Sequence, residues 1–175
     1  MNYEIGRPEP SEYGGGFARY IKLVPAGDIV TLLESQLAGM RTLLQNVSDD
    51  ESLVHHAPYT WSIRQVVGHL TDSERVFGYR ALRFARQDPT PLPSFDENAY
   101  MVAANFDRWE LTDLIAEFQQ LRLSHIAMFR HLEPAAWMHR GTASGQPMSV
   151  RAMAYTIAGH AGHHLKIVRT RLKQG

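Results

Sequence analysis

The chain has 175 residues, of which 44% are hydrophobic, and this suits one domain whose core is large enough to hold a buried site. Its 18 basic and 18 acidic side chains give a formal charge of zero, so it lacks the basic excess that attracts nucleic acid. Cysteine is absent, which excludes disulfides and leaves histidine and carboxylate as the available metal ligands. No apolar run approaches the roughly 18 residues of a membrane span. We therefore expect a cytoplasmic protein without a membrane or nucleic-acid partner.

The beginning of the chain differs in composition from the rest. Residues 1–27 are rich in glycine and proline, which predicts an irregular N-terminal arm laid over the body. Residues 28–175 are expected to form a single helical domain. Its first helix begins after Asp28, a favourable N-cap, because apolar residues recur at helical spacing from there to Val47.

A second helix is predicted from Ser62 to about Gln87. Ser62 and Gln65 have the spacing of a capping box, in which each side chain satisfies a backbone amide of the other. A long connection, residues 88–107, follows and begins with three closely spaced prolines. It is longer than a turn between neighbouring helices requires, and loops of this kind often cover a site.

Two more helices complete the predicted domain. The third carries apolar residues from Leu111 to Leu132 and ends near Pro134, and the last begins with Ser149 as its N-cap. The segment between them, residues 135–147, is predicted to be a loop with room for a short hairpin. The sequence thus predicts an all-α fold, a four-helix bundle with long irregular connections.

Two histidines of the last helix have the spacing of metal ligands. His160 and His164 lie four residues apart inside its apolar stripe, so their imidazoles stack on one helix face and can share one ion. We expect His163 to point away from this face. His69 on the second helix could add a third nitrogen, and a three-histidine site leaves coordination positions open for water or substrate. The alternative is that His160 and His164 are core side chains bonded to backbone or water.

Four other residues are candidates for proton transfer or orientation at such a site: Asp72, Asp96, Tyr100 and His125. Asp96 and Tyr100 belong to the long connection and would shape the pocket and limit water. Asp72, together with Glu74, could accept a hydrogen bond from a ligand imidazole, although acidic residues on helices are usually solvated. His125 lies on the apolar stripe of the third helix and could line the same cavity or be a buried imidazole bonded to backbone or water.

Four stretches of sequence carry a family resemblance: Tyr20-Ile21 with Val24-Pro25 and Asp28; Trp61 to Leu70 with Asp72 and Glu74; Phe95 to Tyr100; and Gly159-His160-Ala161-Gly162-His163-His164-Leu165. With these the chain resembles, over nearly its whole length, the DinB-like (DinB/YfiT-like) metalloproteins, in particular the branch of thiol-dependent transferases and metal-dependent hydrolases. The resemblance implies a four-helix bundle whose metal, zinc or nickel, is held by His69, His160 and His164. It also implies that a low-molecular-weight thiol, such as bacillithiol or mycothiol, can serve as a cofactor.

The predicted function is that of a divalent-metal protein which activates a bound thiol or water. The thiol would be transferred to a small electrophilic substrate, or the water would hydrolyse it. Two other classes of function stay open. One is a non-catalytic bundle that binds metal or a small molecule, and the other is a structural homodimer in which the histidines are merely buried.

Overall fold

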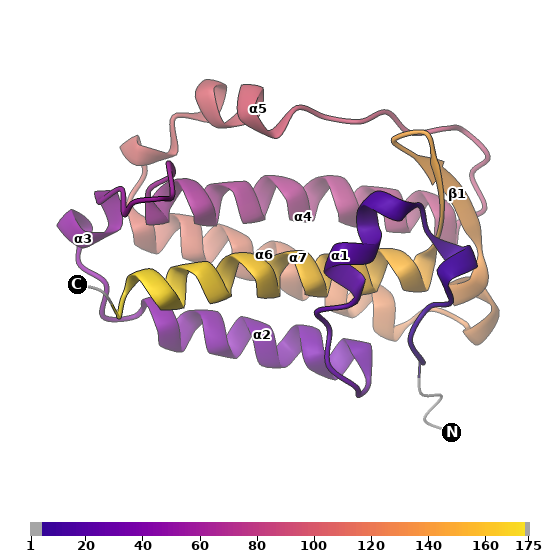
Figure 1. Cartoon of the computed structure of the whole chain (residues 1–175). Helices are drawn as coiled ribbons and strands as arrows, with labels where there is room; N and C mark the ends of the chain where they lie inside the picture. Colours follow the sequence, from indigo (N-terminus) through magenta and orange to yellow (C-terminus); the bar gives the residue numbers. More distant parts are fainter. Residues whose placement is uncertain (1–4, 174–175) are drawn as a thin grey trace.

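The computed structural model describes residues 5–173; the first four residues of the predicted arm and the last two of the predicted domain lie outside them. Four long helices form the body: α2 (Ile29–Leu44), α4 (Ile63–Ala85), α6 (Leu111–Arg130) and α7 (Val150–Arg171). Helices α2 and α4 each pack against both α6 and α7 (Figure 1). The predicted all-α four-helix bundle is confirmed. Within the described residues, no helix is both long and apolar enough to cross a membrane.

Side-chain caps determine where three of these helices begin. Asp28 Oδ1 accepts a hydrogen bond from the Thr31 amide at 2.9 Å, at the start of α2. The predicted capping box of α4 is present, because Ser62 Oγ accepts from the Gln65 amide at 3.0 Å and Gln65 Oε1 accepts from the Ser62 amide at 2.9 Å. Ser149 Oγ caps α7 in the same way. Each cap satisfies an amide that the helix itself leaves unpaired.

The connection between α4 and α6 contains a helix that the sequence analysis missed. Residues beyond the prolines form α5 (Glu97–Ala104), and a 3-10 turn, Phe106–Arg108, follows. The prediction of an irregular loop is wrong here because Asp96 caps α5: its Oδ1 accepts from the Asn98 amide at 2.9 Å and from the Ala99 amide at 3.1 Å. Helix α5 lies outside α4, on the edge of the bundle (Figure 1).

Smaller elements complete the other connections: α3 (Asp49–Leu53), which was not predicted, a 3-10 turn at Pro134–Met138, and the strands β1 (Arg140–Ala143) and β2 (Gln146–Ser149). The strands pair in antiparallel register, with Arg140 opposite Ser149 and Ala143 opposite Gln146. The two residues of their turn, Ser144 and Gly145, both have positive φ, as a type I′ hairpin turn requires.

The N-terminal arm is more ordered than its composition predicts. It contains two 3-10 turns, Pro10–Glu12 and Gly15–Phe17, followed by α1 (Ala18–Ile21). Helix α1 packs on α7 (Figure 1). Gly159 permits this contact, because a Cβ at this position would lie 2.0 Å from the carbonyl oxygen of Tyr20. The arm therefore lies directly beside His160, the next residue of α7.

The apolar core is divided into two clusters by a polar layer. Along α4 one cluster includes Leu70 and the other includes Phe77, and along α7 the change falls between Ala158 and Ala161. Polar side chains of α4, α6 and α7 occupy the boundary, among them His160. The predicted metal ligands therefore lie where the interior of the bundle is not apolar.

Candidate metal centre

Three imidazoles meet between α4 and α7. One ring nitrogen from each of His69, His160 and His164 lies within 4.8 Å of the other two. His69 Nε2 lies 3.0 Å from His160 Nε2. The side chains of His69 and His160 are 7% and 5% exposed, and His164 is partly buried. The structure thus brings together the three residues that the sequence analysis selected as metal ligands.

Burial keeps these imidazoles neutral. It lowers the pKa of His69 to about 4, although the charge of Glu97 acts in the opposite direction. Burial also lowers the pKa of His164 to about 3, with further lowering from neighbouring histidines and Arg19. The pKa of His160 is held well below its usual value by burial and then by His164 and His69. At neutral pH each ring therefore offers a lone pair, which is the form that binds metal.

The nitrogens of the three rings have almost no hydrogen-bond partners within the described protein. Within residues 5–173, no oxygen atom is hydrogen-bonded to His69, His160 or His164, and the contact between the Nε2 atoms of His69 and His160 is the one hydrogen-bond distance the three rings share. Three converging neutral nitrogens with one open side fit a divalent transition metal.

Aromatic rings surround the three imidazoles. The ring centroid of Trp61 lies 4.9 Å from that of His69. The rings of Tyr20 and Phe77 contact His160 edge to face, at centroid distances of 5.1 and 5.5 Å. These contacts restrict the orientation of the imidazoles and limit the access of water. Tyr20 comes from the N-terminal arm, so the arm is part of the wall of the site.

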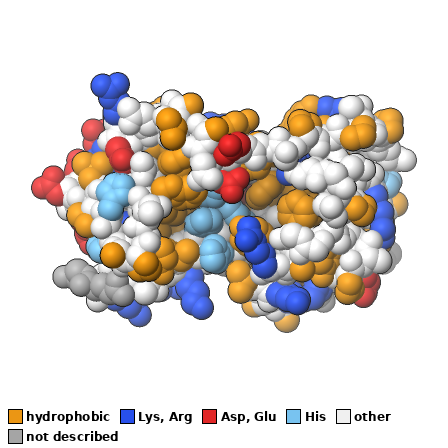
Figure 2. All heavy atoms as spheres, turned by 45° about the horizontal axis from the view of Figure 1, so that its top comes forward, with side chains coloured by type: hydrophobic (Ala, Val, Ile, Leu, Met, Phe, Trp, Pro, Cys, Tyr) orange, Lys and Arg blue, Asp and Glu red, His pale blue; other side chains and the backbone are white. Residues whose placement is uncertain are grey.

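The open side of the three imidazoles faces a cavity of about 790 Å³. A volume of this size is typical of small-molecule sites. Figure 2 shows histidine side chains in a hollow near the middle of one face of the molecule, with basic side chains beside them. Other residues of the cavity wall come from the arm, α4, the long connection and the hairpin: Gly15, Gly16, Phe17, Arg19, Ser73, Arg80, Phe95, Glu97, Ser144 and Gln146.

His163 also borders the cavity, contrary to the expectation that it points away. Its side chain is exposed, and its ring centroid lies 5.1 Å from that of His164 and 6.0 Å from that of Tyr20. The expectation came from α7 alone. Because α1 packs beside this face of α7, the cavity wall extends around the helix to include His163.

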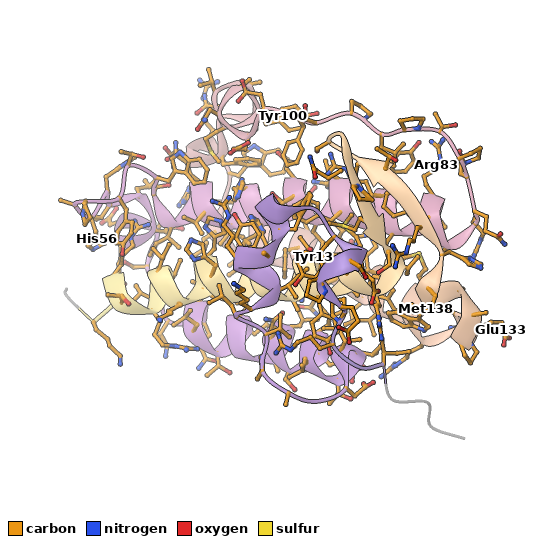
Figure 3. All side chains as sticks on the ribbon, turned by 45° about the vertical axis from the view of Figure 1, so that its right-hand side comes forward. Tyr13, His56, Arg83, Tyr100, Glu133 and Met138 are labelled. Atoms are coloured by element: carbon orange, nitrogen blue, oxygen red, sulfur yellow. The ribbon has the colours of Figure 1, made fainter. Side chains whose placement is uncertain are left out.

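Three of the predicted catalytic residues have local contacts away from the imidazoles. Asp72 Oδ1 lies 3.4 Å from Arg75 Nη1 in an ion pair between neighbouring turns of α4. Asp96 caps α5, as described above. Tyr100 is 45% exposed on α5 (Figure 3), and its ring centroid lies 5.4 Å from that of Phe95. None of the three borders the cavity, and their catalytic roles stay predictions.

His125 belongs to a separate buried cluster. Its Nδ1 lies 3.1 Å from Glu74 Oε1, and the guanidinium of Arg122 donates to both oxygens of the same carboxylate, at 2.7 and 2.9 Å. Burial raises the pKa of Glu74, but the charge of Arg122 and the hydrogen bonds outweigh it and leave this pKa below its usual value. Glu74 is therefore an ionised partner of Arg122 and His125, and it does not orient His69.

Part of the site continues along α4 and was not predicted from the sequence. Ser73, Phe77 and Arg80 all border the cavity together with His69. Their positions, four, eight and eleven residues after His69, repeat at helical spacing. This spacing was the signal that could have identified them. Tyr20 could not be found in this way, because its contact with His160 depends on how the arm folds back.

The fold is shared with solved structures of low sequence identity. YfiT from Bacillus subtilis, described as a probable metal-dependent hydrolase with an unusual four-helix bundle topology, superposes with a TM-score of 0.76 at 17% identity, over 83% of this chain and 85% of YfiT. A mycothiol-dependent maleylpyruvate isomerase gives a TM-score of 0.67 at 15% identity over 83% of this chain. This chain spans only 61% of that isomerase.

The sequence comparisons identify the family. Among curated protein sequences, no match was found. The sequence profile of the DinB superfamily matches residues 32–168. This range includes all three imidazoles of the candidate metal centre, and it includes the four bundle helices except for a few residues at the start of α2 and the end of α7. The chain therefore belongs to the DinB superfamily.

Proposed function

We propose that this chain is a metalloenzyme in which His69, His160 and His164 hold one divalent transition metal, zinc or nickel, and that it acts on a small electrophilic molecule. The observation that carries the proposal is the convergence of three neutral imidazole nitrogens at the wall of a large cavity. A divalent ion held by uncharged ligands would lower the pKa of a coordinated water or thiol and stabilise the resulting anion.

The chain's own residues supply orientation and exclusion of water. Trp61 packs on His69, while Tyr20 and Phe77 pack on His160, so the rings that hold the ion have little freedom to turn. The N-terminal arm covers one side of the cavity through Tyr20. A site held in this way keeps its geometry while the substrate enters and leaves.

Two reactions are consistent with this centre. In hydrolysis the nucleophile is water, in line with the description of YfiT as a probable metal-dependent hydrolase. In the second reaction a low-molecular-weight thiol is the nucleophile, in line with the mycothiol dependence of the isomerase. The thiol would have to be a separate small molecule, because the chain has no cysteine. The cavity volume of about 790 Å³ lies in the range of single-ligand sites and accommodates the substrate of either reaction.

The first experiment is elemental analysis of protein purified without a polyhistidine tag. We expect about one transition metal per chain in the wild type and none in His160→Ala or His164→Ala. His131→Ala is the matched control, because His131 is exposed and bonds to the carbonyl oxygen of its own helix. Unchanged metal content in His160→Ala, in a variant that circular dichroism shows to be folded, would contradict the proposed ligand set.

The second experiment separates the reactions in metal-loaded protein. Thiol transfer predicts consumption of an aromatic chloride electrophile that requires both the metal and an added thiol. Hydrolysis predicts cleavage of nitrophenyl esters that requires the metal alone. Stoichiometric metal without either reaction would favour the non-catalytic binding bundle.

A further inference from the structure

Four arginines are buried within the described residues: Arg64, Arg80, Arg122 and Arg171. A buried guanidinium is costly unless a carboxylate compensates its charge. Arg64 and Arg122 each form an ion pair with such a partner. For Arg80 and Arg171, no carboxylate of residues 5–173 lies within ion-pair distance. These two charges are therefore candidates for binding an anion from outside the chain.

Arg80 lies in the wall of the same cavity as the three imidazoles. It is 2% exposed, and its Nη2 donates to the carbonyl oxygen of Pro93 at 2.6 Å and to Ser144 Oγ at 3.0 Å. Its Cζ lies 5.9 Å from the ring centroids of both Phe77 and Phe95. All these partners are uncharged. They fix the position of the guanidinium and leave its positive charge uncompensated at the cavity wall.

Ser73 lies between Arg80 and His69 on α4, and its hydroxyl lacks a hydrogen-bond partner among the described residues. Ser73 is 1% exposed, and its Oγ is one of the few buried side-chain atoms of the described residues without a hydrogen bond. Serine in a helix can bond to the carbonyl oxygen one turn earlier, but Ser73 does not. A buried hydroxyl that borders a cavity is satisfied when a ligand atom reaches it.

These groups lie in a row along α4. His69, Ser73, Phe77 and Arg80 share one helix face, and the rise of an α-helix separates the first and last by about 16 Å between their Cα atoms. The Phe77 ring lies between the two ends, with its centroid 5.5 Å from that of His160 and 5.9 Å from Arg80 Cζ. The cavity thus has a nitrogen-rich end, an aromatic middle and a cationic end.

We propose that Arg80 and Ser73 bind the carboxylate of an elongated substrate, whose reactive end lies at the three histidines. The assignment of the reactive end rests on the proposed function. A carboxylate matches this subsite because the guanidinium compensates its single negative charge and the hydroxyl can donate a hydrogen bond to it, whereas a phosphate dianion would retain one uncompensated charge. The carboxylate of Glu97 also borders the cavity, but its charge acts on His69 and so belongs to the opposite end.

Arg171 is a weaker candidate for the same role. It borders a separate cavity of about 310 Å³, which contains His164 and neither of the other two imidazoles. It also contacts His56, whose Nδ1 lies 3.4 Å from the Arg171 guanidinium. A substrate there would not face the whole metal centre.

The test measures the binding of matched acid and amide probes by isothermal titration calorimetry. Metal-free protein is titrated with phenylacetate and with phenylacetamide, which differ in charge and little in shape. Zinc-loaded protein is titrated with mercaptobutanoate and mercaptobutanamide, whose thiols can also reach the metal. We expect the wild type to bind each acid about tenfold or more tightly than its amide, because hydrogen bonds to charged groups are the strong ones.

Variants assign that preference to the subsite. Arg80→Gln is expected to remove the preference for the acid and to leave the affinity for the amide unchanged. Ser73→Ala is expected to weaken acid binding several-fold without lowering the melting temperature, since its hydroxyl has no partner to lose. Arg75→Gln is the matched control, because Arg75 lies on the outer face of α4 and pairs with Glu117. It should keep the full preference.

The outcomes separate the subsite from the metal centre. Equal affinity for acid and amide in the wild type would overturn the proposal. So would a loss of both affinities in Arg80→Gln with acid binding unchanged in Ser73→Ala, because Arg80 would then only support the cavity wall. A preference seen in metal-free protein, in a chain that elemental analysis shows to bind no metal, would retain the carboxylate subsite and reject the metalloenzyme.

Discussion

His125 and the three imidazoles of the candidate metal centre lie at the polar layer of the bundle, and they differ in which atoms their ring nitrogens contact. His125 contacts the carboxylate of Glu74, whose charge Arg122 neutralises. The imidazoles of the candidate metal centre have no oxygen partner among residues 5–173 and face a cavity. Both groups are buried, so burial does not distinguish them. The presence or absence of protein partners distinguishes the structural cluster from the candidate metal centre.

The structural cluster should show the largest effect on stability. In Glu74→Gln the buried charge of Arg122 loses its partner, and we expect the free energy of unfolding to fall by about 3 to 5 kcal/mol. Urea denaturation followed by circular dichroism measures this change. Glu117→Gln removes a carboxylate from the exposed ion pair with Arg75 and should cost less than about 1 kcal/mol. Equal losses in the two variants would show that the cluster has no special structural role.

The metal centre should reveal itself in the pH dependence of metal-free protein. The pKa of His69 is about 4 in the folded chain against an ordinary value of 6.5, so between these values the unfolded chain binds more protons. As far as His69 is concerned, the free energy of unfolding is highest above pH 6.5 and decreases as the pH falls towards about 4. The expected loss is roughly 3 kcal/mol. Urea denaturation across this range should show that the free energy of unfolding depends less on pH in His69→Gln than in the wild type. An unchanged pH dependence would show that His69 is not its source.

Metal should stabilise the chain through His69, His160 and His164 and not through His125. At about 100 times the dissociation constant, zinc is expected to add about 2.7 kcal/mol to the free energy of unfolding of the wild type. Scanning calorimetry with and without zinc should show this gain as a higher melting temperature. His164→Ala should lose the gain, whereas His125→Gln should keep it. A gain that persists in His164→Ala would place the metal elsewhere.

The smallest effect concerns the arm, which covers the metal centre and not the structural cluster. In Gly159→Ala the new Cβ would lie 2.0 Å from the carbonyl oxygen of Tyr20, so α1 must move, at a cost of about 1 to 3 kcal/mol. Thermal denaturation measures the loss. Gly39→Ala is the control, because no atom lies within 4 Å of its Cβ, and there the helix should gain about 0.5 to 1 kcal/mol. A neutral Gly159→Ala would show that the close contact is not required.

Local signals predicted the framework correctly. The capping box of Ser62 and Gln65 and the apolar spacing of each segment depend on residues within one or two helical turns, and the four long helices follow from them. Helix α5 was missed because the prolines before it dominated the prediction, while the cap supplied by Asp96 was overlooked. The pairing of His160 with His164 was accessible for the same reason as the helices, since both lie on one face of α7.

The sequence by itself thus determined four amphipathic helices and a pair of histidines with the spacing of metal ligands. Only the tertiary structure decided which polar groups have partners. Glu74 and Arg122 are 48 residues apart, and the contact of Tyr20 with α7 depends on the space left by Gly159. Among residues 5–173, Arg80 has hydrogen-bond partners but no carboxylate to compensate its charge, and the Ser73 hydroxyl has no hydrogen bond. Helical periodicity is a property of neighbouring residues, whereas the satisfaction of a buried charge depends on every segment that packs around it.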